Sequence, residues 1–126
     1  MVDVDHFKRV NDQYGHPAGD RMLYAVAQSL VNLMRPNDMI VRFGGEEFIV
    51  LLPDLELPEA MTIAERLRAG IAAVKVRIDG VLEPLSVTVS LGVDRMLPNE
   101  TLETLVASAD AALYRAKAGG RNRVAV

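Results

Sequence analysis

Apolar residues recur every three or four positions in three stretches of the chain, which is the spacing of one face of an α-helix. We predict amphipathic helices over residues 18–34, 58–74 and 101–118. Pro36 lies just beyond the first stretch, and Pro58 lies in the first turn of the second. Gly119 and Gly120 follow the third, so each predicted helix has a start or stop signal.

Shorter apolar runs, rich in β-branched residues, predict the strands. They span residues 1–5, 39–43, 48–52, 74–78, 81–85, 86–93 and 123–126. Gly-Gly-Glu-Glu joins the second run to the third and Asp79-Gly80 joins the fourth to the fifth, so two hairpins are expected. Residues 7–14 are polar and end in a Gly-His-Pro break, and no regular element is predicted there. The order of elements predicts an α+β fold, a layer of helices against a mostly antiparallel sheet.

The composition excludes several classes of partner and site but identifies no function. A chain of 126 residues, 50% of them hydrophobic, can build one packed core, and residues 1–126 are assigned to a single domain. With 14 basic and 17 acidic residues the net charge is −3, so neither a nucleic acid polymer nor an anionic membrane is an expected partner. The chain has no cysteine, which excludes disulfides and thiolate zinc sites and is compatible with a reducing cytoplasm. No apolar run is long enough for a spanning helix.

Two acidic segments are candidates for metal chemistry. Asp3 and Asp5 are two positions apart in the first predicted strand, so both carboxylates can face one side of it. Mg²⁺ prefers one or two carboxylates together with substrate phosphates. Glu46 and Glu47 follow two glycines at the predicted hairpin tip, where the absence of side chains leaves room for a flat ligand. The alternatives are a solvated acidic strand face and an ordinary turn, with glycine supplying a positive φ.

A basic segment ends the third predicted helix. Lys117, Arg121 and Arg123 lie around the Gly119-Gly120 stop signal. Cations at this end complement the helix dipole, and they could equally clamp a phosphate. Spacing alone leaves both interpretations open.

Taken together and in order, these segments resemble the GGDEF domain, the family of diguanylate cyclases, over essentially the whole chain. The segments are Asp3-Val4-Asp5-His6-Phe7-Lys8, Asn11-Asp12, Tyr14-Gly15-His16, Gly19-Asp20, Arg42-Phe43-Gly44-Gly45-Glu46-Glu47-Phe48, Val87-Thr88-Val89-Ser90-Leu91-Gly92, Ala109-Asp110, Ala112-Leu113-Tyr114, Ala116-Lys117 and Gly119-Gly120-Arg121-Asn122. The resemblance implies a nucleotidyl-cyclase-like (ferredoxin-like) fold and a cytoplasmic signalling enzyme. Such an enzyme joins two GTP into cyclic di-GMP and releases two pyrophosphates, with Mg²⁺ or Mn²⁺ as cofactor and two domains facing each other as a homodimer.

The resemblance also implies roles for individual residues. Asp3, Glu47 and the Val4 carbonyl are similar to the family's metal ligands, and Glu46 to the group that helps deprotonate the attacking 3′-hydroxyl. The implied substrate-binding residues are Phe7, Lys8, Lys117 and Arg121 for the phosphates, Asn11 and Asp20 for guanine, and Gly44 and Gly45 for space around GTP. Asp5 is similar to the family's second Asp, for which a structural role is expected.

Arg35 and Asp38 resemble the family's product-inhibition site. They form an Arg-x-x-Asp motif that five residues separate from Gly44, and the resemblance implies that they bind cyclic di-GMP. The alternative is an Arg–Asp ion pair at a helix end.

The chain departs from the family pattern at its front, where only Met1 and Val2 precede Asp3. The body of the first, central strand is therefore expected to be missing, which would leave its two neighbours without a hydrogen-bonding partner. From this gap we expect a homodimer or higher oligomer and little cyclase activity. A module that binds cyclic di-GMP or GTP without turnover is the alternative function.

Overall fold

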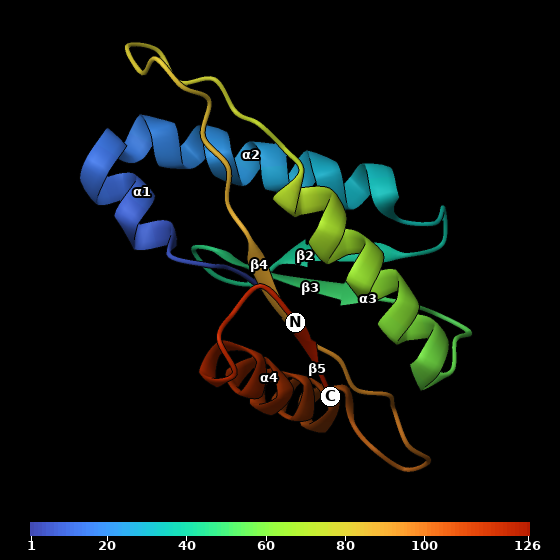
Figure 1. Ribbon diagram of the computed structural model, residues 1–126. Coiled ribbons are helices and arrows are strands. Elements are labelled where there is room, and N and C mark those ends of the chain that lie inside the picture. Colours follow the sequence, from blue (N-terminus) through green and yellow to red (C-terminus); the bar gives the residue numbers. More distant parts are fainter.

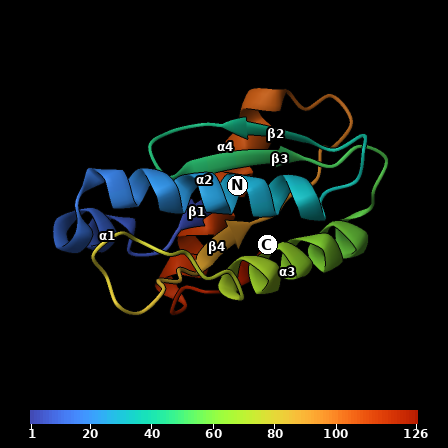
Figure 2. The same ribbon diagram turned by 90° about the horizontal axis from the view of Figure 1, so that it is seen from above.

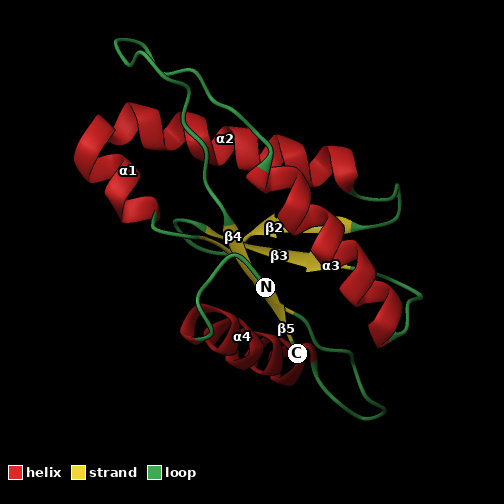
Figure 3. Ribbon diagram, in the orientation of Figure 1, coloured by secondary structure: helices red, strands yellow, loops and turns green.

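The computed structural model describes residues 1–126, which form four helices and a five-stranded sheet (Figures 1 and 3). In chain order the elements are β1 (Val2–Val4), α1 (Phe7–Tyr14), α2 (His16–Leu33), β2 (Met39–Arg42), β3 (Glu47–Leu51), α3 (Leu57–Ala72), β4 (Val89–Gly92), α4 (Leu102–Ala118) and β5 (Val124–Ala125). The three helices that the apolar spacing predicts are present, with ends shifted by one or two residues. No helix combines the length and apolar character that crossing a membrane requires.

The sheet has the strand order β2-β3-β1-β4-β5, so the three-residue strand β1 lies at its centre. All neighbours are antiparallel except β4 and β5, which are parallel. The expectation of an α+β fold with a mostly antiparallel sheet is therefore confirmed.

Helices cover both faces of the sheet, with α2 and α3 on one face and α4 on the other (Figures 1 and 2). Val2 and Val4 of β1 join the core beneath α2 and α3. Met1 packs instead with Ala109 and Leu113 of α4. Because side chains alternate along a strand, Asp3 is directed to the same face as α4.

The expected gap at the centre of the sheet is not present. Val2–Val4 pairs with β3 on one side and with β4 on the other, and these three residues are fully buried. Met1 extends the pairing, because its carbonyl accepts from the Gly92 amide at 2.9 Å and its amino group donates to the Gly92 carbonyl at 2.9 Å. Three residues suffice here because both neighbours bond them, so an unfilled centre no longer argues for self-association.

Two local predictions are wrong. Residues 7–14 form helix α1, since Phe7 is buried and a helical turn places Val10 on the same side. Of the second hairpin, only the bridge between Val76 and Leu85 forms. The Asp-Gly turn is present, with the Val81 amide donating to the Ile78 carbonyl at 3.1 Å, but the segment projects from the sheet as a loop (Figure 1).

Candidate functional site

Two carboxylates face each other across the centre of the sheet. Asp3 of β1 is the register partner of Glu47 of β3, and Asp3 is only 4% exposed. Burial and the neighbouring Asp3 carboxylate raise the pKa of Glu47. Lys117 of α4 places its Nζ 3.1 Å from Asp3 Oδ2. Two carboxylates are therefore close together, and the ammonium group of Lys117 lies beside one of them.

The donor set of this pair fits a hard divalent cation. It consists of oxygen atoms on a rigid strand pair, which suits Mg²⁺ or Mn²⁺ better than a sulfur- or imidazole-preferring metal. The chain has no group of three or more His, Cys, Asp or Glu side chains that could form a complete cage. Asp3 and Glu47 would hold a cation together with a backbone carbonyl such as that of Val4, and leave further positions for water or substrate phosphate.

The hairpin tip beside this pair is held by backbone and guanidinium contacts. The Phe43 and Gly44 amides donate to the Glu47 carbonyl at 2.9 and 3.3 Å. Arg42 donates to the Gly44 carbonyl at 3.2 Å and to the Gly45 carbonyl at 2.7 Å. Glu46 is half-buried between the tip and β3.

The expectation that the tip needs glycine for a positive φ is wrong. Neither Gly44 nor Gly45 has a positive φ, and the Arg42 guanidinium donates to the carbonyls of both. A Cβ on Gly45 would meet nothing within 4 Å, and one on Gly44 would only touch Glu47 at 3.9 Å. Since the folded chain itself does not require these two glycines, the open space above them is available to a ligand.

The predicted phosphate- and base-binding residues lie around the same end of the sheet. Phe7 and Lys8 start helix α1, whose first amides have no partner within the helix. Asn11 of α1 lies against Gly19 of α2, next to Asp20. Asp20 lines a cavity of about 450 Å³ together with Leu23, Tyr24, Ala27, Arg42 and Phe48.

Lys117 lies in the last turn of α4, and Arg121 lies in the turn that follows this helix. Lys117 contacts Asp3, as described above. Arg121 is exposed, has a φ of 63°, and donates its amide to the Ala116 carbonyl at 3.0 Å. The structure thus places one cation of α4, Lys117, beside the acidic groups on β1 and β3.

Arg35 and Asp38 lie at the opposite end of β2 from the tip and bind each other. Arg35 Nη2 and Nε donate to Asp38 Oδ1 at 2.6 and 3.0 Å, and Nη2 also donates to the Pro53 carbonyl at 2.9 Å. The Asp38 side chain is fully buried, whereas that of Arg35 is 36% exposed. In this structure the motif therefore forms the ion pair that sequence analysis left as the alternative.

Asp38→Asn is expected to destabilise the fold by about 1 kcal/mol at neutral pH, after allowance for solvent around Arg35. The hydrogen bonds from Arg35 lower the pKa of Asp38 from its ordinary value of 3.8. Asp38 therefore stabilises the fold at pH above 3.8, and this contribution is lost as pH falls through the lower pKa of the folded chain. Thermal melts should show the gap between wild type and variant narrowing as pH falls below 3.8. A gap that is constant with pH would contradict the ion pair.

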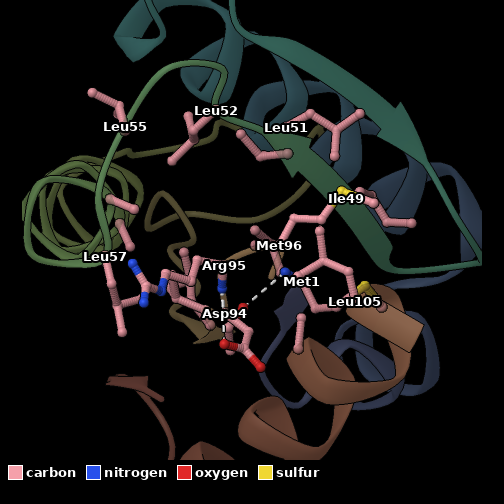
Figure 4. A pocket seen from close by; sticks show the side chains of 18 of the residues that line it. Met1, Ile49, Leu51, Leu52, Leu55, Leu57, Asp94, Arg95, Met96 and Leu105 are labelled. Carbon is pink, nitrogen blue, oxygen red and sulfur yellow. Dashed lines mark hydrogen bonds between the residues drawn. The ribbon is translucent and has the colours of Figure 1, made fainter. Parts of the chain in front are cut away.

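A second cavity, of similar size, is lined by other residues than this site. It has a volume of about 450 Å³ and 18 of its 24 lining residues are hydrophobic. Figure 4 shows Met1, Ile49, Leu51 and Leu52 around it, with the Met1 amino group bonded to the Gly92 carbonyl. None of the predicted site residues lines it, so its lining offers none of the carboxylates and cations described above.

Two residues that shape the site had no predicted role. Arg42 braces the tip, and Gly19 makes room for Asn11. Both lie in segments that carry the family resemblance, which was the only signal for them. Asp5, for which a structural role was expected, accepts from the Asn122 amide in the turn after α4, and only the fold reveals that these two segments are close.

Comparison with known proteins gives consistent similarities. The family model described as "Diguanylate cyclase, GGDEF domain" matches residues 1–123. The chain is 49% identical over 126 residues to diguanylate cyclase DgcP of Pseudomonas aeruginosa, covering 100% of this chain and 18% of DgcP. It is 45% identical over 124 residues to diguanylate cyclase DgcM of Escherichia coli K12, covering 98% and 29%. The chain thus spans less than a third of the length of these two relatives.

Solved structures are similar throughout the fold. Diguanylate cyclase SiaD of Pseudomonas aeruginosa, in complex with its activator SiaC, aligns with a TM-score of 0.93 at 43% identity, covering 98% of this chain and 46% of SiaD. The GGDEF domain of DgcB from Caulobacter crescentus, in complex with c-di-GMP, aligns with a TM-score of 0.93 at 35% identity, covering 98% and 73%.

Proposed function

The chain belongs to the GGDEF family of diguanylate cyclases, and we propose that it binds GTP with Mg²⁺ or Mn²⁺ and joins two GTP into cyclic di-GMP. The observation that carries the proposal is the Asp3–Glu47 pair on adjacent central strands, with Lys117 as its neighbouring cation. A bound divalent cation would neutralise this pair and polarise the GTP phosphates.

Residues of the chain itself would supply the base and the groups that bind the phosphates. The 3′-oxygen of one GTP forms a bond with the α-phosphorus of the other, and the bond from that phosphorus to the β-phosphate bridge breaks, releasing pyrophosphate. Glu46 accepts the proton of the 3′-hydroxyl, as a carboxylate base beside the tip can do. The amides of Phe7 and Lys8, with Lys117 and Arg121, offset the charge of the phosphates. The open space over Gly44 and Gly45 admits the nucleotide.

The reaction needs two facing sites, because each chain offers one Asp3–Glu47 pair. We therefore propose a homodimer or higher oligomer as the active form, with a rate per chain that rises with protein concentration. We also propose that cyclic di-GMP inhibits through Arg35 and Asp38. In support, the guanidinium of Arg35 is partly exposed and lies at the far end of β2 from the tip. The alternative of binding without turnover gains no support from the intact Glu46 and Glu47.

Asp20→Ala is expected to weaken GTP binding roughly tenfold, because the guanine edge would lose its carboxylate partner. ATP, which lacks the guanine N1 and N2 donors, should bind weakly to both proteins and show little change. Calorimetry with Mg²⁺ and each nucleotide measures both effects. Equal loss for the two nucleotides would show that Asp20 acts on the fold, and no GTP binding by wild type would contradict the proposed function.

Gly19→Ala is expected to displace Asn11 and weaken GTP binding by about tenfold as well. The new Cβ would lie 1.8 Å from Asn11 Oδ1 and 2.9 Å from its Cγ, so the Asn11 side chain must rotate away. Alanine is otherwise favoured over glycine within a helix by about 1 kcal/mol, which helps to offset the displacement. The melting temperature should change little. Unchanged GTP affinity would exclude Asn11 from guanine recognition.

A further inference from the structure

Asp5 is a buried carboxylate that the proposed chemistry does not use. It is only 4% exposed and forms no ion pair. Its Oδ1 accepts from Ser90 Oγ at 2.7 Å, and its Oδ2 accepts from Thr88 Oγ1 at 2.7 Å and from the Asn122 amide at 2.9 Å. Burying a carboxylate costs free energy unless hydrogen-bond donors surround it. Three donors from two distant segments therefore compensate the burial of Asp5.

The Asn122 amide belongs to the turn that follows α4, and this turn is unusual. Gly120, Arg121 and Asn122 have consecutive φ values of 117°, 63° and 46°. Arginine and asparagine rarely adopt this left-handed conformation, and two in succession persist only where surrounding contacts hold them. The backbone bonds of the turn lead back to α4 and to β4, through the amides of Gly120 and Arg121 and the carbonyl of Arg123.

Asn122 is held from a second side by helix α3. Its Oδ1 accepts from Arg68 Nη1 at 2.8 Å. Arg68 is itself oriented by Glu65, to which its Nε and Nη2 donate at 2.9 and 2.6 Å. The backbone and the side chain of Asn122 are thus fixed by two different groups, Asp5 from the sheet and Arg68 from the helix.

We propose that Asp5 and Arg68 are positioning residues that clamp Asn122 and thereby hold Arg121 beside the Asp3–Glu47 pair. Asp5 lies directly after β1 and two residues after Asp3, while Arg121 precedes Asn122 directly. The Asp5 carboxylate therefore ties the end of the strand that bears Asp3 to the turn that bears Arg121. The proposal rests on the proposed function, in which Arg121 contacts the phosphates of GTP.

The clamp is tested first without nucleotide. Amide hydrogen exchange of Arg121 and Asn122 in the whole chain is expected to accelerate at least about tenfold in Asp5→Asn, since one acceptor oxygen is replaced by a donor. Arg68→Met should accelerate the same amides to a smaller extent, and it keeps the proposal testable if Asp5→Asn does not fold. Arg66→Met is the matched control, because Arg66 of the same helix donates to the Leu33 carbonyl instead. Unchanged exchange in both Asp5→Asn and Arg68→Met would overturn the clamp.

The link to Arg121 is tested by a double-mutant cycle on GTP affinity with Mg²⁺. Asp5→Asn and Arg121→Ala are each expected to weaken binding about tenfold, and the double variant no more than the weaker-binding single variant. Additive losses would overturn the positioning role, because they would show that Asp5 acts independently of Arg121. If Arg121→Ala alone leaves affinity unchanged, the phosphate contact of the proposed function fails and the positioning role fails with it, whereas the exchange result stands by itself.

Discussion

Glu47→Gln is expected to lower kcat for cyclic di-GMP formation by at least about 10²–10³-fold while the fold survives. Glu47 lies opposite Asp3 in the sheet, and these two carboxylates are the acidic groups that would hold the metal between them. Glutamine keeps the shape of the side chain but removes the charge that balances a divalent cation. Since burial and the Asp3 carboxylate disfavour the charged form of Glu47, the free variant should melt no lower than wild type.

The measurement is GTP turnover with Mg²⁺, followed by nucleotide chromatography, beside a thermal melt without nucleotide. Glu83→Gln is the control, because Glu83 is an exposed loop residue whose loss of charge should leave the rate unchanged. Glu46→Gln should lower kcat by about 10²-fold as the loss of a base, with little change in metal affinity. A Glu47→Gln variant that turns over GTP at the wild-type rate would remove Glu47 from the metal site.

Gly92→Ala is expected to destabilise the fold by more than about 3 kcal/mol. A Cβ at this position would lie 2.1 Å from the Ala109 carbonyl oxygen and 2.2 Å from the Leu113 nitrogen. Both atoms belong to the backbone of α4, so no side-chain rotation relieves the overlap. The helix would have to move off the sheet, and it would carry Lys117 away from Asp3.

Urea unfolding of the free chain measures this effect, and Gly45→Ala is its control. A Cβ on Gly45 meets nothing within 4 Å and its φ is not positive, so that variant should stay within about 0.5 kcal/mol of wild type. If Gly92→Ala were as stable as wild type, α4 could not pack against β4 as closely as the structure has it.

Much of the fold follows from local pattern. The apolar stripes of α2, α3 and α4 were sufficient to place those helices, because each buries one face against the sheet, α2 and α3 on one side and α4 on the other. The glycine-containing connection placed β2 and β3. Helix α1 escaped prediction because a single buried aromatic, Phe7, secures an otherwise polar segment. The second hairpin failed because Asp79-Gly80 makes a turn wherever it occurs, whereas a ladder also needs a neighbouring strand to pack against.

The site was predictable as a set of residues but not as an arrangement. The motifs identify Asp3 and Glu47, yet only the pairing of β1 with β3 places them opposite each other. The bond between Asp5 and Asn122 joins positions 117 residues apart, so no local spacing reports it. The sequence likewise does not show why position 92 needs glycine. Helix α4 approaches the backbone of Gly92 too closely for a Cβ, whereas the φ of this glycine is not unusual.

We propose above that this chain joins two GTP through the Asp3–Glu47 pair, and one assay tests this directly. The purified chain is incubated with GTP and Mg²⁺ over a range of protein concentrations, and cyclic di-GMP and pyrophosphate are quantified. We expect one cyclic di-GMP and two pyrophosphates for each two GTP consumed, with a rate per chain that rises with protein concentration and vanishes in Glu47→Gln. A chain that binds GTP but forms no cyclic di-GMP at any concentration, with Mg²⁺ or Mn²⁺, would contradict it.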